Sequence, residues 1–578
     1  MSPELVCQRF DFLRQERKNA ESTWDDIRSY IAPFRGEFFR DQTEEQSVRH
    51  DYSMIYDGTG IQANEMLASN LHGNLTSPYI PWFHLAFRQD SLNSDSEARA
   101  WLEEVSSMIW TTLQESNFSR EIAEAYLDLT TFGTATLVEE AASPVPTEWE
   151  GVNFTAIPLK QSFFEERPDG TVSHFYRGVM MTPLQIVEKF GEKNVPDDIR
   201  DKAAGPTASS DKELIVFAIW PRFPETGLSG DEEIQTKLLP PKKRPYGYCY
   251  CRHRDKTLLR EGGYYEMPAF VTRWSRVSDS KWGHGPSHIA LYDVKTLNRQ
   301  EELTLQALAK VVDPPQKTTE RGLLGDLDMA AGGLTVVRNM DDLKPIETGT
   351  DWRAIEMERE NRRAMIREYY LVSRLELKES PTMTATEVER RWQQMTKLLG
   401  PTLGRLQNDL LEPLIETTYA ILARAGLLPP MPQVLMAEGG ELDIEFTGPM
   451  PLAQKSDAAL AIEGELALAT NLAQIHGPGV LDVIDAPAAL REHARLRGVP
   501  AKVIRSEAQI RKREEERKAQ AAQMEQLAVA EKGAKAMKDA AQGAKAGAEA
   551  QAMANQMGGG ESNVIPMPGA GAAGGGGA

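Results

Sequence analysis

Two cysteines and a histidine that lie close together in the chain are the first residues that could do chemistry. Cys249 and Cys251 are separated by one residue and His253 follows; thiolate and imidazole are preferred ligands of Zn²⁺. A structural zinc site needs four ligands, however, and the sequence offers no second ligand pair. The residues that alternate with the cysteines are Tyr246, Tyr248 and Tyr250. Such alternation is typical of a strand with two faces, and we interpret the segment as a β-strand.

Two histidines, His284 and His288, have the four-residue spacing of a zinc-protease helix. Gly285 and Pro286 lie between them, and no glutamate occupies the position that this motif requires. We interpret the segment as a turn that leads into a helix.

Two aspartates in the segment GLLGDLDMAAGG, Asp326 and Asp328, are the best candidates for a catalytic metal site. Paired carboxylates can hold Mg²⁺ in a nuclease, and Asp313 could add a third ligand. The segment reads as a flexible loop without further fixed acids. The chain also contains no G-x-x-x-x-G-K-[ST] loop and no G-x-S-x-G motif. We therefore predict no catalytic residue, no metal and no cofactor, with a metal-dependent DNA nuclease as the alternative.

The length and charge of the chain limit the remaining classes. With 578 residues the chain should form several domains. A formal net charge of −20 argues against a freestanding nucleic-acid binder but not against a protein that contacts DNA only inside a channel. Three cysteines cannot form a disulfide framework, so a reducing compartment fits. We find no signal peptide and no apolar run that could span a bilayer, and expect a cytoplasmic location before assembly.

Hydrophobic periodicity predicts a mainly helical chain with one β-rich region. Residues 3–32, 53–74 and 96–132 read as helices, and residues 134–275 read as an α+β domain that includes a short helix at MTPLQIVEKFG. The later elements are a helix at 287–312, a strand at GLTVVRNM, a charge-dense helix at 351–373, a helix at about 384–425 interrupted near Gly400, shorter helices in 452–498 and a helix after Pro500. The Gly-rich tail beyond Met557 should be disordered.

Charge is concentrated on the 351–373 helix. Glu358 and Arg362 are spaced for an i,i+4 ion pair, which is usual on a solvated helix face. The same pattern also suits an interface at which opposite charges on neighbouring copies meet. The sequence leaves these two interpretations open.

Five segments, in this order along the chain, resemble one protein family. They are PELVCQRFDFLRQERKNAESTWDDIRSYIAPFRGEF, KWGHGPSHIALYDVKTLN, PTMTATEVERR, GRLQNDLLEPLI and FTGPMPLAQKSDAA. Together they resemble the head-to-tail connector, or portal, proteins of short-tailed, podovirus-type bacteriophages. The resemblance extends from residue 3 to about residue 520.

The resemblance implies an α+β, mainly α, portal-type subunit with an α+β wing, a two-helix stem, a small α/β clip, a helical crown and a C-terminal barrel helix. By position, the parts are the wing at 1–286, stem helix 1 at 287–312, the clip at 313–350, stem helix 2 at 351–373, the tunnel loop at 374–383, a long wing helix and return at 384–451, the crown at 452–505, the barrel helix at 506–557 and a disordered tail at 558–578.

The resemblance also implies a function without chemistry. Such proteins form closed rings, typically of twelve subunits, at one capsid vertex of the virion. Double-stranded DNA is packaged through the ring by the terminase motor and later ejected through it, and the tail attaches to it. The implied partners are non-specifically held DNA, the terminase large subunit, a tail or adaptor protein, and the scaffold and major capsid proteins. The implied locations are the virion portal vertex and, before assembly, the host cytoplasm. Another internal virion structural protein is the remaining alternative.

Candidate site residues follow from this correspondence. The DNA-tunnel candidates are Arg374 and Lys378, and the candidates for docking terminase or tail at the clip are Lys317, Arg321 and Arg338. The candidates for inter-subunit contacts in the stem are Arg359, Arg362, Arg363, Arg367, Glu356, Glu358 and Glu360.

Overall fold

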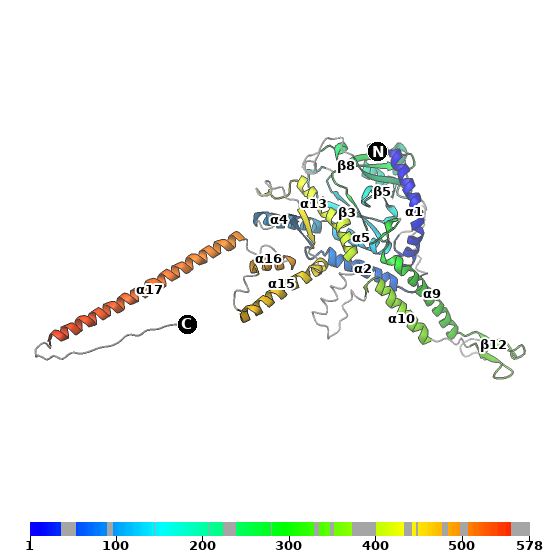
Figure 1. Ribbon diagram of the computed structural model, residues 1–578. Coiled ribbons are helices and arrows are strands. Elements are labelled where there is room, and N and C mark those ends of the chain that lie inside the picture. The colour runs from blue at the N-terminus through cyan, green and yellow to red at the C-terminus, as the bar shows by residue number, and fades with distance from the viewer. Residues whose placement is uncertain are drawn as a thin grey trace. The chain divides into compact units, whose positions relative to one another are not determined.

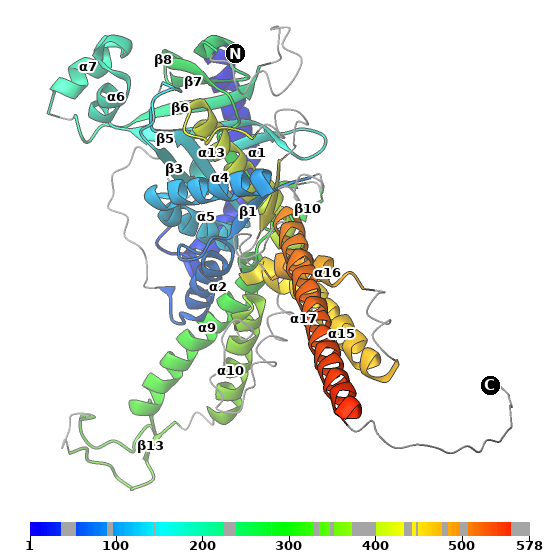
Figure 2. The ribbon, with the colours of Figure 1, turned by 90° about the vertical axis from the view of Figure 1, so that its left-hand side faces the viewer.

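The fold is described from a computed structural model in which the chain divides into two units, Met1–Val503 and Ile504–Ala578. The residues described are 1–35, 54–88, 96–143, 145–206, 208–222, 239–278, 280–328, 334–346, 352–372, 400–432, 442–446, 449–476, 484–497 and 507–556. Figures 1 and 2 show these elements in two views. The tunnel-loop candidates Arg374 and Lys378 lie outside the described residues.

The first helix, α1 (Pro3–Ile31), agrees with the prediction to within one residue. The Ser2 side chain accepts the Leu5 N–H and so caps the helix start. One face of α1 packs on a five-stranded antiparallel sheet through Val6, Cys7, Phe10 and Leu13. The strand order in this sheet is β4 (Ser162–Glu166), β5 (Val172–Met181), β6 (Glu213–Pro221), β7 (Tyr246–Arg252) and β8 (Leu258–Tyr264).

A buried arginine fastens α1 to this sheet. The Arg17 guanidinium donates to the backbone carbonyls of Leu159, Lys160 and Ser162 at 2.8–3.0 Å. It also donates to the Glu21 carboxylate at 2.8 Å, one turn along α1. Burial lowers the pKa of Arg17 to about 10, so the guanidinium stays charged at neutral pH. The three carbonyl contacts depend on the position of α1 against the start of β4, whereas the Glu21 contact lies within α1.

Two short helices cover part of the other face of the sheet. They are α6 (Pro183–Phe190) and α7 (Asp197–Ala204), and Ile186, Phe190 and Ile199 form a small core with Ile215 of β6. Thr182 and Gln185 form a capping box at the start of α6, which explains why sequence alone placed this helix correctly.

A second sheet lies at the centre of the main core, in the strand order β3 (Val152–Ile157), β2 (Thr134–Ala141) and β9 (Ala269–Arg273). The helices that contribute buried residues to this core include α2 (Thr59–Leu75), α4 (Ser96–Glu115) and α5 (Phe118–Phe132). Residues 96–132 are helical as predicted but form two helices, because the chain breaks at Ser116 and Asn117, where the Asn117 side chain binds the Phe154 backbone on β3. The start predicted at Ser53 for α2 is wrong, because residues 55–58 are not helical and α2 begins at Thr59, whose N–H donates to Asp57 just before the helix.

Two strands distant in sequence pair with each other, which the sequence did not predict. β1 (Phe83–Phe87) is antiparallel to β14 (Leu442–Phe446), with Phe83 opposite Phe446. Trp82 stacks on Phe446 with ring centroids 6.3 Å apart, so the pair extends the main core. The two strands of this pair therefore come from segments near opposite ends of the main unit's sequence.

The later helices follow the predicted order. A helical stretch from residue 400 contains a π-helical turn at Gln407–Leu411 and continues as α13 (Glu412–Arg424). It is followed by α15 (Pro449–His476) and α16 (Ala486–Leu496). In the second unit, α17 (Glu507–Gln556) is one 50-residue helix that includes Gly533, Gly543 and Gly547. Its assignment to a barrel stays a prediction.

A buried carboxyl group joins α13 to β2 and gives a testable prediction. Glu139 is 1% exposed and accepts a hydrogen bond from the Thr418 hydroxyl at 2.7 Å. Burial raises the pKa of Glu139 well above its ordinary value of 4.5, and the nearby Glu266 carboxylate raises it further, while the Thr418 hydrogen bond opposes the shift. Ionisation therefore costs the folded state free energy, and stability should fall as pH rises from 4.5 towards the native pKa.

Glu139→Gln should remove this pH dependence, because glutamine resembles the protonated acid. Relative to the variant, the wild-type free energy of unfolding should fall by about 1.4 kcal/mol per pH unit above pH 4.5, until the native pKa is passed. Urea unfolding of both proteins over a pH series measures this difference. Parallel pH profiles would show that Glu139 ionises freely in the folded protein.

Candidate functional site: the two-helix arm

Two antiparallel helices leave the main core side by side and form an arm (Figures 1 and 2). They are α9 (Pro286–Val312) and α10 (Trp352–Tyr369), close to the helices predicted at 287–312 and 351–373. The short strands β12 (Gln316–Thr318) and β13 (Leu343–Pro345) lie between them in sequence and pair at the far end. Placement of a strand at GLTVVRNM was wrong, since within its described residues only Val337 forms a bridge, with Leu323.

Close packing of glycines fixes the base of the arm. Gly133 ends α5 with φ of 74°, and its backbone lies against Gly283 and Gly285. A Cβ atom on Gly283 would lie 2.0 Å from the Gly133 carbonyl oxygen, so only glycine fits. The segment KWGHGPS therefore holds α9 against α5, and the Ser287 hydroxyl adds a hydrogen bond to the Thr130 carbonyl at 2.9 Å.

Ion pairs hold α10 against α9. Arg359 donates to Glu301 at 2.9 Å, and Arg362 donates to Asp293 at 3.0 Å. Arg363 bridges two elements, because it donates to Glu301 at 2.7 Å and to Asp57, at the start of α2, at 3.0 Å. Hydrogen bonding to Glu360 and the charges of Asp57 and Glu301 raise the pKa of Arg363. The three arginines thus join the two arm helices, and Arg363 also connects the arm to the start of α2.

These contacts show where the predicted stem residues lie. The guanidinium groups of Arg359, Arg362 and Arg363 are directed into the subunit, with side chains 17–26% exposed. The acidic candidates on the same helix are 50–56% exposed: Glu356, Glu358 and Glu360. Arg367 is also exposed. The part these seven residues play between copies stays a prediction.

Large apolar side chains point away from the shared surface of the arm. On α9, Tyr292 is 75% exposed and Leu303 is 47% exposed, on the face turned away from Asp293 and Glu301. On α10, Met357 is 67% and Met365 is 48% exposed, on the face turned away from the three arginines. Each helix therefore turns charged side chains towards its neighbour and carries large exposed apolar side chains on its other side, which on α10 lie among exposed glutamates.

At the end of the arm, the clip candidates are all accessible. Lys317 lies on β12 opposite Lys344, and Arg321 and Arg338 lie in the neighbouring turns; all three are exposed. Apolar residues accompany them: Leu324 is 57%, Leu334 is 83% and Met340 is 93% exposed. The sequence reasoning found the cations but missed this apolar surface, whose signal is a set of large aliphatic residues within a Gly-rich segment.

The candidate metal ligands do not assemble. Asp313 lies at the end of α9, and Asp326 and Asp328 are exposed beside the clip strands. Within the described ranges, no group of three or more His, Cys, Asp or Glu residues could hold a metal ion. Cys249 and Cys251 lie on strand β7, as predicted, and His253 pairs with Asp11 at 2.8 Å. His284 and His288 lie at the turn into α9, also as predicted, and burial lowers the pKa of His288 to about 4.

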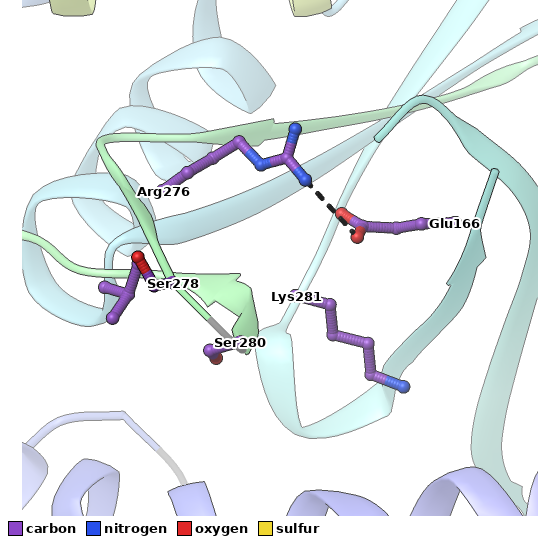
Figure 3. Close-up of a pocket in the computed structure, with 6 residues that line it drawn as sticks. Glu166, Arg276, Ser278, Ser280 and Lys281 are labelled. Carbon is purple, nitrogen blue, oxygen red and sulfur yellow. Dashed lines mark ion pairs between the residues drawn. The ribbon is translucent and has the colours of Figure 1, made fainter. Parts of the chain in front are cut away.

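A surface hollow of about 450 Å³ lies beside the hairpin of β10 (Arg276–Val277) and β11 (Ser280–Gly283), just before α9 (Figure 3). Its lining residues are Glu166, Arg276, Val277, Ser278, Ser280 and Lys281. Glu166 pairs with Arg276 at 3.8 Å and with the buried Arg273, and Lys281 pairs with Glu16. These charged side chains pair with each other or with Glu16. The ion pairs therefore hold the hairpin in place, and the hollow does not present a nucleophile with a base beside it.

Comparison with known proteins shows which family this chain resembles in sequence. A sequence model of the family described as "Bacteriophage head to tail connecting protein" matches residues 4–504. The "Probable portal protein" of Bordetella phage BPP-1 is 28% identical over 512 residues, covering 87% of this chain and 88% of that protein. The "Portal protein" of Salmonella phage epsilon15 is 27% identical over 559 residues, covering 95% of this chain and 96% of that protein.

Two solved assemblies from gene transfer agent particles are more distant. A chain of the native virion has a TM-score of 0.33, covering 72% of this chain and 88% of its own length. A chain of the neck of the empty particle has a TM-score of 0.35, with 75% and 94% covered. Both are 11% identical to this chain, and likeness this weak contributes nothing to the assignment. In the part of the chain that the structure describes, no helix is both long and apolar enough to cross a bilayer.

Proposed function

The chain belongs to the family of bacteriophage head-to-tail connecting proteins, and from this premise we propose that about twelve copies form the closed ring through which the phage genome passes. The protein is a connector, or portal, component of the virion. The match over residues 4–504 carries this conclusion, since it includes the whole arm and the core that holds it. The ring would stand at one capsid vertex and bind capsid and tail proteins on its two sides.

The outer faces of the arm support assembly with other copies. Tyr292 on α9 and Met357 on α10 lie on different sides of one arm. Contact between two different faces of identical subunits is heterologous, and it closes into a ring when the rotation between copies divides a full turn. The exposed glutamates of α10 could flank this contact, together with Arg299 of α9, whose side chain is 63% exposed. In this arrangement the arginines keep each arm rigid and the apolar faces join the copies.

A ring of mainly acidic subunits suits a polyanion that must slide. Each Lys or Arg contact to a phosphate adds affinity and tends to hold the DNA in one position. A formal charge of −20 per chain keeps such contacts few. We assign the few that remain to Arg374 and Lys378, the tunnel-loop candidates. Twelve-fold symmetry also does not match the ~10–10.5 base pairs per turn of DNA, so no register is favoured.

The exposed clip is the proposed docking surface for the terminase large subunit during packaging and for a tail or adaptor protein afterwards. Lys317, Arg321 and Arg338 would supply charge there, and Leu334 and Met340 would supply apolar contact. Assembly with scaffold and major capsid proteins, and a cytoplasmic stage before it, complete the proposal.

Electron microscopy of the purified protein tests the ring directly. End-on class averages should show rings with a central hole and about twelve-fold symmetry. Monomers or pore-free oligomers at every salt concentration, in the presence of scaffold and capsid proteins as well as alone, would contradict the proposal.

The nuclease alternative predicts a different result and has no support from the site. Incubated with linear double-stranded DNA and Mg²⁺, the protein should produce no cleavage above the buffer control, because the three aspartates are exposed and separate. Asp326→Ala should behave identically. Mg²⁺-dependent cleavage that this substitution abolishes would restore the nuclease assignment.

A further inference from the structure

All three cysteines of the chain meet in one buried cluster, although one of them is far from the other two in sequence. Cys7 comes from α1, and Cys249 and Cys251 come from β7. The three side chains are at most 2% exposed. The Cys7 and Cys251 sulfur atoms are 3.6 Å apart, in van der Waals contact, and the surrounding residues include Val6, Phe163 and Val216.

Neither metal binding nor packing alone accounts well for this contact. Among the residues that the structure describes, no cluster of cysteine, histidine and carboxylate side chains has the arrangement of a metal site. Alanine or valine would fill the space without a reactive group. Two thiols in contact can do one further thing, which is to form a bond by two-electron oxidation. A disulfide requires the sulfurs to approach from 3.6 Å to about 2.05 Å.

The two thiols are also unequal, as a redox pair should be. The contact with the Cys251 thiol lowers the pKa of Cys7, and burial opposes this shift. The neighbouring Cys249, the contact with Cys7 and burial raise the pKa of Cys251. Cys7 is therefore the thiol that becomes a thiolate first, and the thiolate is the nucleophile in disulfide exchange.

We propose that Cys7 and Cys251 form a reversible disulfide that locks α1 onto the five-stranded sheet once the protein leaves a reducing compartment. The oxidant is a small-molecule disulfide. The Cys7 thiolate attacks one of its sulfurs and releases the other half as a thiolate, which takes up a proton. The Cys251 thiolate, after losing its proton to solvent, attacks the Cys7 sulfur and releases the second half. Two protein thiols are oxidised and one small disulfide is reduced to two thiols.

The proposal fits the life of a virion component, which is made among reducing thiols and then persists in an oxidising medium. The bond would connect Cys7 to a residue 244 positions later, so it would restrict the unfolded chain over a long loop. It would act in addition to the Arg17 contacts, which fasten the same helix further along. The lock concerns the folded subunit and does not depend on ring formation.

Thiol–disulfide titration of the full-length protein tests this pair. Wild-type, Cys7→Ser and Cys249→Ser proteins are equilibrated with oxidised or reduced glutathione, at a temperature that permits local opening of α1. Free thiols are then blocked with N-ethylmaleimide, and non-reducing peptide mass spectrometry identifies linked cysteines. We expect a Cys7–Cys251 linkage in the wild type and in Cys249→Ser, complete reversal by dithiothreitol, and no linkage in Cys7→Ser.

Thermal unfolding gives a second readout. Oxidation should raise the melting temperature of the wild type and of Cys249→Ser by roughly 4–8 °C and leave Cys7→Ser unchanged. A linkage between Cys249 and Cys251, a stable glutathione adduct at Cys7, or three free thiols after equilibration would each overturn the proposal. Because Cys249→Ser changes an equally buried thiol of the same cluster, it separates loss of the bond from general damage to the core.

Discussion

Tyr292→Glu should abolish ring assembly and leave the folded subunit intact. Tyr292 is 75% exposed on the outer face of α9, so a carboxylate there meets water in the single chain and costs little. In the ring the same carboxylate would be buried against a neighbouring copy without a partner. Such burial costs several kcal/mol at each contact; about 3 kcal/mol already weakens association by roughly 100-fold. The penalty recurs at every interface of the ring.

Size-exclusion chromatography with light scattering, followed by negative-stain microscopy, measures this loss. Met357→Glu should have the same effect, because it alters the opposite face of the arm. Tyr292→Phe is the matched control. It should still form subunit rings, since the aromatic side chain is kept and only its hydroxyl is removed. Normal rings from Tyr292→Glu would show that copies meet elsewhere and would leave the arginines and glutamates of α10 as the better interface candidates.

Arg17→Met should lower the free energy of unfolding by about 3–5 kcal/mol. Methionine fills much of the same volume but supplies none of the hydrogen bonds to the carbonyls of Leu159, Lys160 and Ser162. It also leaves the Glu21 carboxylate buried without its cation. Both losses fall on the contact between α1 and the start of β4, so α1 should become the first element to detach.

Urea unfolding followed by circular dichroism gives the stability, and hydrogen exchange locates the opening. Lys18→Met is the matched control, because Lys18 is the next residue of the same helix and is exposed; it should change stability by no more than about 0.5 kcal/mol. An Arg17→Met protein as stable as the control would mean that burial of this charge gains nothing over an apolar side chain, as happens in some buried ion pairs.

The sequence predicted elements whose signals are local. α1 has a cap, a proline at its first position and a helical apolar stripe, and α6 has a capping box. β7 alternates tyrosines with cysteines, and its two faces do meet different surroundings. The helix α9 begins and ends near its predicted limits, since Gly285, Pro286 and Pro314 flank it, whereas α10 ends at Tyr369, before the predicted residue 373, with no proline or glycine close behind it.

Elements that depend on distant partners were missed or misplaced. The segment GLTVVRNM was predicted to be a strand, but the strands that pair are β12 and β13, which carry lysines and a proline. The residues of β1 form a strand by pairing with β14, and their own sequence gives no sign of this partner. The arginines of α10 were identified as charge-bearing, but only the fold could show that Asp57, Asp293 and Glu301 receive them. Side-chain partners from other elements leave no trace in local spacing.

The pairing of β1 with β14 has a consequence for biosynthesis. β1 leaves the ribosome early, but its partner strand follows only after most of the main unit has been translated. At roughly 5–20 residues per second, β1 waits for roughly 20–70 s with one backbone edge open and Trp82 without its stacking partner. The growing chain therefore cannot complete its core, or present two finished arm faces on a stable base, until residue 446 has emerged.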